Sequence, residues 1–329
     1  MNTFGRNIRL TTFGESHGKA MGGILDGVPG NVRLDMETIL QAVGRRRPGQ
    51  SALVSARNEP DIPEILSGVT DDMVTLGTPI GFIVRNTDHH SSDYAEFARM
   101  YRPNHADFTY DMRYGLHEPR GGGRASARET VNWVIAGAIA SQLPCMKGIE
   151  IHAQLVAVGG VEGTPDRLAE VVEEAIKTGD SVGGIVECTI SGMPAGKGNP
   201  VFGKLHARLA EAMMTINAAK GFEYGDGFAT ASSRGSEQAD IFTCEDGKIT
   251  TLSNHSGGIQ GGISNGMPIR FRVAFKPTPT LLRDIPTVDK EGNSCILKGK
   301  GRHDPCVAIR AVPVVEAMAA LVVCDELIH

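Results

Sequence analysis

The chain has 329 residues, of which 41% are hydrophobic and 22% are charged, and its formal net charge is −5. This composition is typical of a globular enzyme, and the acidic balance argues against partnership with nucleic acid. Six cysteines without a C-x-x-C pair argue against a zinc site and against a disulfide framework. The N-terminal segment has no apolar signal core and no apolar run approaches about 20 residues, so the sequence predicts a reduced cytoplasmic protein without membrane contact.

The predicted elements combine helices with strands that have one polar face. Glycine-broken residues 18–30 are predicted to form a turn and a strand. Period-two alternation predicts strands at residues 149–157 and 269–275, and such alternation is typical of antiparallel sheets with one wet face. Helices are predicted at residues 126–143, 164–179, 203–219 and 312–328.

The predicted helices differ in how much of their surface is apolar. The helix at 164–179 is amphipathic, with Thr164 as N-cap, Pro165 in its first turn and Gly179 after its last turn. The other three are apolar around much of their circumference, which is typical of helices buried on several sides. The sequence therefore predicts an α+β fold with buried helices layered between antiparallel sheets, in a single domain over residues 1–329.

The stretch "GESHG" at residues 14–18 matches the G-x-S-x-G pattern around the nucleophile of α/β-hydrolases. That motif needs a strand before the serine, a helix after it and an oxyanion loop earlier in the chain. Only fifteen residues precede Ser16, and the segment after it is predicted to be turn and strand. The context argues against a serine hydrolase, although a triad assembled from distant Asp and His residues stays an alternative.

Arginine is clustered in two parts of this acidic chain. Any single arginine is more often part of a solvated helix face, but two glycine-flanked blocks suit a small polyanionic ligand, because guanidinium groups bind phosphate and carboxylate bidentately. The two blocks are Arg45 to Arg47, and Arg99, Arg102, Arg113, Arg120, Arg124 and Arg128.

Three residues are candidates for proton transfer. His17 and His105 differ from the other histidines because glycine, proline or arginine flanks each of them, whereas His89 and His90 lie in a polar stretch. Most single histidines are structural, so this is a hypothesis about two of them. Asp304 stands just before the last predicted helix, where it is either a helix cap or a base beside the arginines.

Two glycine-rich stretches are candidate ligand loops. Residues 118–130 lead into a predicted helix start near Ser126, and free backbone N–H groups there can bind an anion; the alternative is a flexible turn with an ordinary N-cap serine. Residues 254–266 precede the strand that ends in "KPTPT" at 276–280, where glycines admit a flat ring or a phosphate. The residues alone therefore predict an enzyme acting on a small polyanion, without a metal motif, or a non-catalytic protein that binds one.

Ten segments together resemble chorismate synthases over essentially the whole chain. The resemblance implies a single α+β domain assembled as a homotetramer. It also implies conversion of 5-enolpyruvylshikimate 3-phosphate to chorismate by 1,4-elimination of phosphate and a ring proton. Reduced FMN would be required without net redox, and NADPH would serve only as a flavin reductant. The segments are "TTFGESHG", "RRRPGQ", "EPDIPEILSGV", "GTPIGFIVRNTD", "YRPNHADFTY", "RGGGRASARET", "INAAKGFEYGDGF", "GGIQGGISNGMPI", "KPTPT" and "GRHDPCVAIRAVPVVEAM".

The same resemblance implies roles for individual residues. His17 looks like the acid that serves the reduced flavin, and His105 like the acid beside the departing phosphate. Asp304 resembles the aspartate that helps the flavin N5 accept the ring proton, and Ser16 and Ser126 match serines that assist. The positions that match substrate-binding arginines are Arg46, Arg102 and Arg128. The positions that match flavin contacts are Arg124, Ala125, Ser126, Asn217, Ala218, Gly261, Lys276, Pro277, Thr278, Pro279, Thr280 and Arg302.

Two positions depart from the family pattern. Ala52 stands where many members carry arginine or lysine, and Asn58 follows Arg57 where a second basic residue is usual. Both belong to a segment linked to anion or NADPH contact. The sequence therefore leaves open whether this chain reduces its own flavin or depends on an external reductant.

Overall fold

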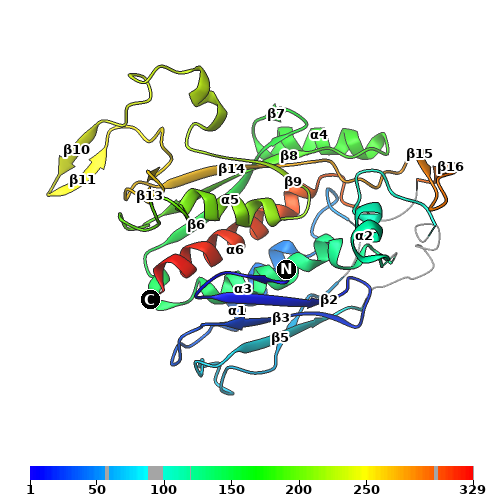
Figure 1. The fold of residues 1–329 in the computed structure, drawn as a ribbon, viewed down its shortest axis with the longest axis horizontal. Coiled ribbons are helices and arrows are strands. Elements are labelled where there is room, and N and C mark those ends of the chain that lie inside the picture. The colour runs from blue at the N-terminus through cyan, green and yellow to red at the C-terminus, as the bar shows by residue number, and fades with distance from the viewer. Residues whose placement is uncertain (56–58, 88–98, 119, 300–302, 329) are drawn as a thin grey trace.

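The computed structural model describes residues 1–55, 59–87, 99–118, 120–299 and 303–328. Two five-stranded antiparallel sheets lie on either side of a layer of helices (Figure 1). The predicted α+β fold with helices between antiparallel sheets is thereby confirmed. The helices are α1 (Met36–Arg46), α2 (Asp107–Tyr114), α3 (Thr130–Ala140), α4 (Pro165–Lys177), α5 (Leu205–Thr215) and α6 (Val307–Leu327).

The two sheets are built from different halves of the chain. The N-terminal sheet has the order β1-β2-β3-β5-β4, and the C-terminal sheet has the order β7-β6-β8-β14-β9. The first consists of β1 (Thr3–Phe4), β2 (Arg9–Gly14), β3 (Ala20–Asp26), β4 (Pro63–Ile65) and β5 (Ile80–Arg85). The second consists of β6 (Glu150–Val158), β7 (Val161–Glu162), β8 (Gly184–Ser191), β9 (Ala219–Tyr224) and β14 (Ile269–Phe275).

Three short hairpins project from this framework. The β10–β11 hairpin extends away from the body of the molecule, at the upper left of Figure 1. The hairpins pair β10 (Phe242–Glu245) with β11 (Lys248–Thr251), β12 (Ile259–Gln260) with β13 (Ile263–Ser264), and β15 (Ile285–Val288) with β16 (Ser294–Leu297).

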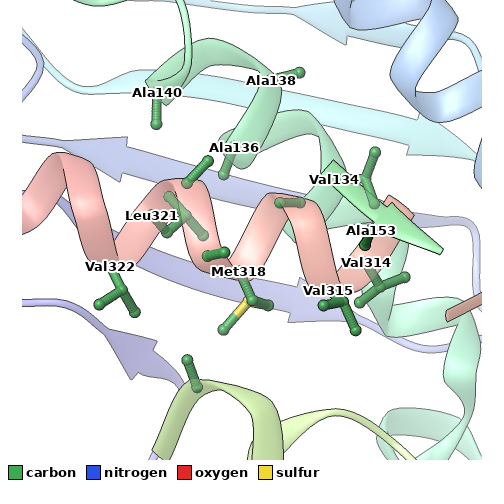
Figure 2. Close-up of a cluster of buried hydrophobic side chains, with 14 of the residues drawn as sticks. Val134, Ala136, Ala138, Ala140, Ala153, Val314, Val315, Met318, Leu321 and Val322 are labelled. Carbon is green, nitrogen blue, oxygen red and sulfur yellow. The ribbon is translucent and has the colours of Figure 1, made fainter. Parts of the chain in front are cut away.

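Helix α6 is the centre of the core. It packs against α3 and α1 on one side and against β6 and β8 on the other, so most of its length has no solvent-exposed face. Figure 2 shows α6 beside α3, with the side chains of both helices in one apolar cluster. Small residues permit this close approach: a Cβ on Gly137 would lie 2.6 Å from the Cβ of Ala317.

The expectation that no apolar run approaches membrane-spanning length is wrong for α6. Among the described residues, this is the one helix long and apolar enough to cross a membrane. However, most of this apolar stretch is buried inside the protein. A helix at the centre of a folded core satisfies the same criteria, and the packing of α6 is of that kind.

The positions of two elements, α4 and β14, were predicted correctly from the sequence. Helix α4 begins at Pro165 after Thr164, and Gly179 adopts a φ of +68° after its end, as predicted. Along β14 the side chains of Ile269, Phe271, Val273 and Phe275 are buried, which confirms the predicted alternation.

Several helix boundaries differ from those predicted. The helix expected over 203–219 ends at Thr215, and Ala219 already belongs to β9. The helix expected from residue 126 first makes a 3₁₀ turn, Ala127–Glu129, and α3 begins at Thr130. The last helix begins at Val307, five residues earlier than residue 312. Helix ends depend on local capping contacts that an apolar pattern does not encode.

The C-terminal end of α6 ties down the start of the chain. The buried carboxylate of Asp325 accepts hydrogen bonds from the backbone N–H groups of Arg6, Asn7 and Ile8, at 2.5 to 3.2 Å. Arg208 of α5 forms an ion pair with the same carboxylate. These bonds satisfy a charge that would be costly to bury alone.

Candidate active site

A cavity of about 410 Å³ lies where the ends of several elements meet. Its wall combines the C-terminal ends of α1, α5 and β14 with the segments that precede α2 and α6. Thirteen predicted site residues line it. They are Arg46, Arg102, His105, Ala125, Ser126, Arg128, Asn217, Ala218, Lys276, Thr278, Pro279, Thr280 and Asp304.

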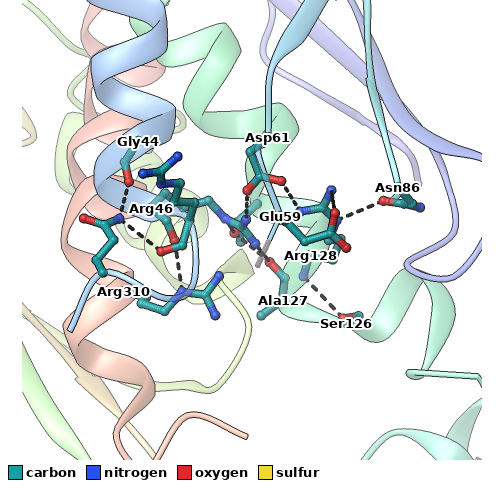
Figure 3. A network of polar contacts seen from close by, with 12 residues as sticks. Gly44, Arg46, Glu59, Asp61, Asn86, Ser126, Ala127, Arg128 and Arg310 are labelled. Atoms are coloured by element: carbon teal, nitrogen blue, oxygen red, sulfur yellow. Dashed lines mark hydrogen bonds and ion pairs between the residues drawn. The ribbon is translucent and has the colours of Figure 1, made fainter. Parts of the chain in front are cut away.

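Two of the predicted substrate arginines share one buried carboxylate (Figure 3). Arg46 Nη1 donates to Asp61 Oδ2 at 3.0 Å, and Arg128 Nη1 bonds the other oxygen, Oδ1. Arg46 also donates to the Thr130 hydroxyl and to the Ala127 carbonyl, both at 3.0 Å. The Asp61 side chain is fully buried, so this carboxylate fixes the two guanidinium groups in one arrangement.

Arg46 stays charged although it is buried beside other cations. Burial, with the charges of Arg310 and Arg128, lowers the pKa of Arg46 to about 9, although Asp61 opposes the shift. A guanidinium with that pKa remains charged at neutral pH. Arg128 also lies 3.8 Å from the buried Glu59 carboxylate, so the two arginines face two carboxylates. Lys276 in the same wall adds the positive charge that suits an anion.

Asn86 connects this cluster with the turn between β2 and β3. Its side-chain Oδ1 accepts from Arg128 Nε at 3.0 Å, and its Nδ2 donates to the carbonyls of Glu15 and Gly18 at 3.0 and 2.9 Å. Asn86 follows the last residue of β5 directly. One amide therefore holds both an arginine of the cavity and the turn that carries His17.

A second buried carboxylate organises the opposite part of the wall. Asp107, the first residue of α2, accepts from Arg102 Nε at 2.7 Å and from Arg102 Nη2 at 2.6 Å. Its Oδ1 also lies 2.7 Å from His105 Nδ1. The side chains of Arg102 and Asp107 are at most 4% exposed, so this pair is shielded from water.

The environment of His105 favours the neutral imidazole. Burial is the largest effect and lowers its pKa, and the charges of Arg102 and Lys276 act in the same direction, while Asp107 opposes them. Burial, followed by the charge of Lys220, also lowers the pKa of Lys276. An anion in the cavity would reverse this balance for both groups.

Ser16 and His17 lie behind the cavity wall. Both are about 5% exposed, and Ser16 Oγ lies 3.2 Å from His17 Nδ1. Gly121 lines the cavity with a φ of +63°, and a Cβ there would overlap the His17 ring. The glycine thus places a bare stretch of backbone between His17 and the cavity.

The local structure also decides against the hydrolase alternative. Ser16 lies in the turn between two antiparallel strands, β2 and β3, and no helix follows it. A nucleophile elbow requires the strand–turn–helix arrangement that exposes the serine. Ser16 has neither the exposure nor the context of an acyl nucleophile.

Asp304 is held from two sides and does not cap α6. Its Oδ1 accepts from the Ser55 backbone N–H at 2.9 Å, and its Oδ2 accepts from Arg310 Nη1 at 2.6 Å. The N-cap position of α6 is Cys306. Arg310 in turn donates from Nε to the Arg46 carbonyl at 2.9 Å, which joins Asp304 to the arginine cluster.

Small residues and backbone form the part of the wall assigned to a flavin by the resemblance. Ala125, Ala218 and Pro279 present little side chain, and Asn217 Nδ2 donates to the Ala125 carbonyl at 3.0 Å. The Oδ1 of Asn217 is buried and has no hydrogen-bond partner in the described part of the chain. An acceptor in that state is available to an N–H group of a ligand. Ser126 lines the same cavity and also caps its turn, accepting from the Arg128 N–H at 3.3 Å.

Three predicted flavin contacts do not line this cavity, and a fourth lies outside the described residues. Arg124 pairs with Glu129 at 2.8 Å and faces a neighbouring cavity of about 880 Å³. Gly261 lies in the β12–β13 turn, near the N-terminal end of α5, whereas Asn217 follows its C-terminal end, roughly 16 Å away along an 11-residue helix. Pro277 lies between two lining residues in the chain, and Arg302 falls outside the described residues, as does Asn58.

Sequence reasoning missed the residues that hold the site together. Asp61, Asp107, Asn86 and Arg310 each bind a predicted site residue, and none was singled out. The available signal was an acidic residue within the quoted segments "EPDIPEILSGV" and "YRPNHADFTY". Several surface arginines, by contrast, do not reach the site: Arg45 pairs with Glu316 and Arg120 with Glu118.

Comparison with known proteins assigns the family. A family model described as chorismate synthase matches residues 8–328. The chain belongs to the chorismate synthase family. A chorismate synthase of Porphyromonas gingivalis is 52% identical over 350 positions, which cover 99% of this chain and 95% of the relative. A chorismate synthase of Parabacteroides distasonis is 49% identical, with 100% and 98% covered.

A solved structure agrees with this assignment. A crystal structure of chorismate synthase matches the fold with a TM-score of 0.75 at 31% sequence identity, covering 98% of this chain and 92% of that one. Membership of this family identifies the chain as an enzyme. The resemblance stated from the sequence is confirmed over the full length of the chain.

Proposed function

We propose that this chain converts 5-enolpyruvylshikimate 3-phosphate to chorismate, as a lyase that eliminates phosphate and a ring proton. The observation that carries the proposal is the convergence of three buried arginines on one cavity that also contains His105. The substrate bears a phosphate and two carboxylates, which need cations when they are desolvated. Arg46, Arg102 and Arg128 would bind these groups.

Two residues would move protons. His105 stands beside Arg102 in the wall, where it would give a proton to the departing phosphate. Phosphate and a ring proton are eliminated together. Asp304, held by Ser55 and Arg310, would assist removal of that ring proton. Ser16 and His17 would support the flavin side of the site from behind Gly121.

The wall fits reduced FMN as cofactor. Ala125, Asn217 and Ala218 line the cavity beside the 276–280 segment, whose Lys276 N–H donates to the Ala218 carbonyl at 2.9 Å. The partnerless Asn217 Oδ1 is suited to an N–H donor of a flavin ring. These residues, with Lys276, Thr278 and Thr280, would hold the group. When bound, reduced FMN supplies transient electron donation that helps phosphate leave, without net redox. NADPH would act only as the reductant of the flavin, and the exposed Ala52 offers no charge for it.

The assembly and location are also proposals. A homotetramer of four 35.0-kDa chains, about 140 kDa, is supported by apolar side chains that a single chain leaves exposed. They gather on the projecting hairpin and the loops beside it, where Phe228 is 82%, Ile249 67% and Leu252 71% exposed. Light scattering of the purified protein tests this mass. We further propose that the protein is cytoplasmic, as its reduced thiols suggest.

The deciding experiment is an anaerobic assay with 5-enolpyruvylshikimate 3-phosphate and chemically reduced FMN, following chorismate. We expect product with reduced FMN, and a parallel reaction with oxidised FMN and NADPH reports whether the chain reduces its own flavin. Folded protein that forms no chorismate with reduced FMN would overturn the proposal. Saturable binding of substrate without product would indicate a binding protein.

A further inference from the structure

Asp107 contacts two predicted site residues at once. It binds Arg102 through two nitrogens and His105 through Nδ1, and its side chain is 2% exposed. Burial acts to raise the pKa of Asp107, but the hydrogen bonds from Arg102 and His105 outweigh it and hold that pKa far below its usual value. The carboxylate is therefore ionised and can only accept hydrogen bonds.

This contact fixes the tautomer of His105. Because Asp107 Oδ1 has no proton to give, the proton between the two residues must be on His105 Nδ1. In the neutral ring, Nε2 then carries the lone pair. The Cε1–Nε2 edge of the ring faces Gly122, whose Cβ position would lie 2.7 Å from Cε1 and 3.1 Å from Nε2.

We propose that Asp107 is the positioning residue of His105, and that it makes Nε2 the nitrogen that takes up a proton when an anionic substrate binds and gives it to the departing phosphate. The inference rests on the proposed function for the identity of that substrate. It assigns a positioning role to Asp107, a residue that neither the motifs nor the family comparison singled out. Asp107 acts through His105 and Arg102 and does not itself line the cavity.

The charges around the ring explain why the proton arrives with the substrate. The charged groups that face His105 are Arg102 and Asp107 from its own segment and Lys276 from the end of β14. Burial and the two cations keep the pKa of the ring below its usual value while the cavity holds no anion. A phosphate beside Nε2 adds negative charge and favours the imidazolium.

The proton balance of the reaction closes on this scheme. One proton passes from solvent to Nε2 as the substrate binds. The C–O bond then breaks with its electron pair on the phosphate oxygen, which takes the Nε2 proton. The electron pair of the ring C–H bond enters the new diene, and the ring proton leaves to solvent with the assistance of Asp304. His105 is left neutral, with its Nδ1 proton still donated to Asp107 in a hydrogen bond, and is ready for the next substrate.

The same helix provides a matched control. His117 Nδ1 lies 2.7 Å from Asp111 Oδ1, the same atoms at the same distance as in the His105–Asp107 pair. Asp111 is also on α2, and its other partners are Tyr101 and Lys290. His117 lines the neighbouring cavity instead of the arginine-lined one. Asp111→Asn therefore removes a similar bond without touching the site.

The first test reads the tautomer and needs no change at Asp107. Histidine labelled with ¹⁵N is incorporated into the wild-type protein and into His105→Gln, and the difference between their solid-state spectra at pH 7.5 isolates His105. We expect a protonated Nδ1 and an unprotonated Nε2. An Nε2–H tautomer, or an imidazolium in the absence of substrate, would overturn the assignment. This result stands whether or not the proposed reaction is correct.

The second test measures proton uptake on binding. 5-Enolpyruvylshikimate 3-phosphate is titrated calorimetrically in two buffers of different ionisation enthalpy, with oxidised FMN so that no turnover occurs. We expect uptake of roughly one proton per site in the wild type and in Asp111→Asn, and less than about half of that in Asp107→Asn. Asp107→Asn should also lower kcat about 10²-fold. Unchanged uptake in Asp107→Asn, or saturable binding without uptake in the wild type, contradicts the proposal, whereas no binding at all counts against the proposed function.

Discussion

The cavity is bordered by two clusters that have the same plan and different partners. In the first, the buried carboxylate of Asp61 holds Arg46 and Arg128. In the second, the buried carboxylate of Asp107 holds Arg102 and His105. Each acid is shared by two cavity residues, so each fixes a pair of side chains instead of one.

The difference lies in what the second partner can do. Both partners of Asp61 are guanidinium groups, which stay charged across the physiological range and can only bind. One partner of Asp107 is an imidazole, which can change its charge near neutral pH. The comparison teaches that one wall of the cavity supplies constant positive charge, while the other supplies charge and a proton.

The largest effect is expected from removing the shared acid of the first cluster. Asp61→Ala removes the carboxylate that the two buried arginines share and leaves Glu59 beside Arg128 alone, which should lower the free energy of unfolding by about 3–5 kcal/mol. Denaturant unfolding measures this change. Asp284→Ala removes the partner of the exposed Lys298 and should have little effect, because exposed ion pairs contribute little. Equal losses for the two variants would show that Asp61 does not bear the buried charge.

Two glycine substitutions, one beside His105 and one as its control, test the geometry of the second cluster. Gly122→Ala introduces a methyl group 2.7 Å from His105 Cε1, at a φ of +79°, and should lower kcat about 10²-fold by displacing the ring. Gly115 has a φ of +77°, and beyond its chain neighbours no heavy atom of the described residues lies within 4 Å of its Cβ position. Gly115→Ala therefore imposes the same backbone strain without the contact. Steady-state kinetics of both variants separate strain from displacement, and equal kcat values would refute the contact.

Because the arginines of the first cluster stay charged, we expect that disturbing their contacts weakens substrate binding. Arg46→Lys keeps a cation but cannot reproduce three simultaneous contacts, so KM for 5-enolpyruvylshikimate 3-phosphate should rise roughly 10–100-fold with a smaller change in kcat. Arg45→Lys, one residue earlier and 53% exposed, should behave as wild type. A fall in kcat at unchanged KM would assign Arg46 to the chemical step instead.

The smallest effect is expected on the pH dependence of stability. The pKa of His105 is lowered in the folded protein, so below the ordinary value of about 6.5 the unfolded chain binds more protons than the folded one. The stability contributed by His105 is therefore complete above that pH and is lost as the pH falls through it. Unfolding curves of wild type and His105→Gln between pH 5 and pH 8 test this, and an equal slope in both would contradict it.

Sequence reasoning found the groups that face the ligand and missed the groups that hold them. Arg46, Arg102 and Arg128 stand out because arginine clusters beside glycine are uncommon in an acidic chain. Asp61 does not stand out among 38 acidic residues. Its role depends on contacts with residues 15 and 67 positions away, which no local pattern encodes.

The same distinction applies to the fold. Local signals located α4, because Pro165 and Gly179 mark its ends, and β14, because its alternation is regular. The 3₁₀ turn before α3 and the position of Gly261 relative to the cavity were not predicted. Both depend on how distant segments pack, and neither is set by the residues nearby.

The bonds from Asp325 to the backbone of residues 6–8 join segments separated by 317 to 319 positions. During synthesis on the ribosome, the N-terminal sheet emerges long before α6, the helix against which the central layer packs. The first strands pack against α3, and α3 and α1 in turn pack against α6, so this half of the core is completed only when nearly the whole chain has been translated. For a cell producing this protein, the vulnerable period is the time between the first strand and the last helix, when chaperones have most to protect.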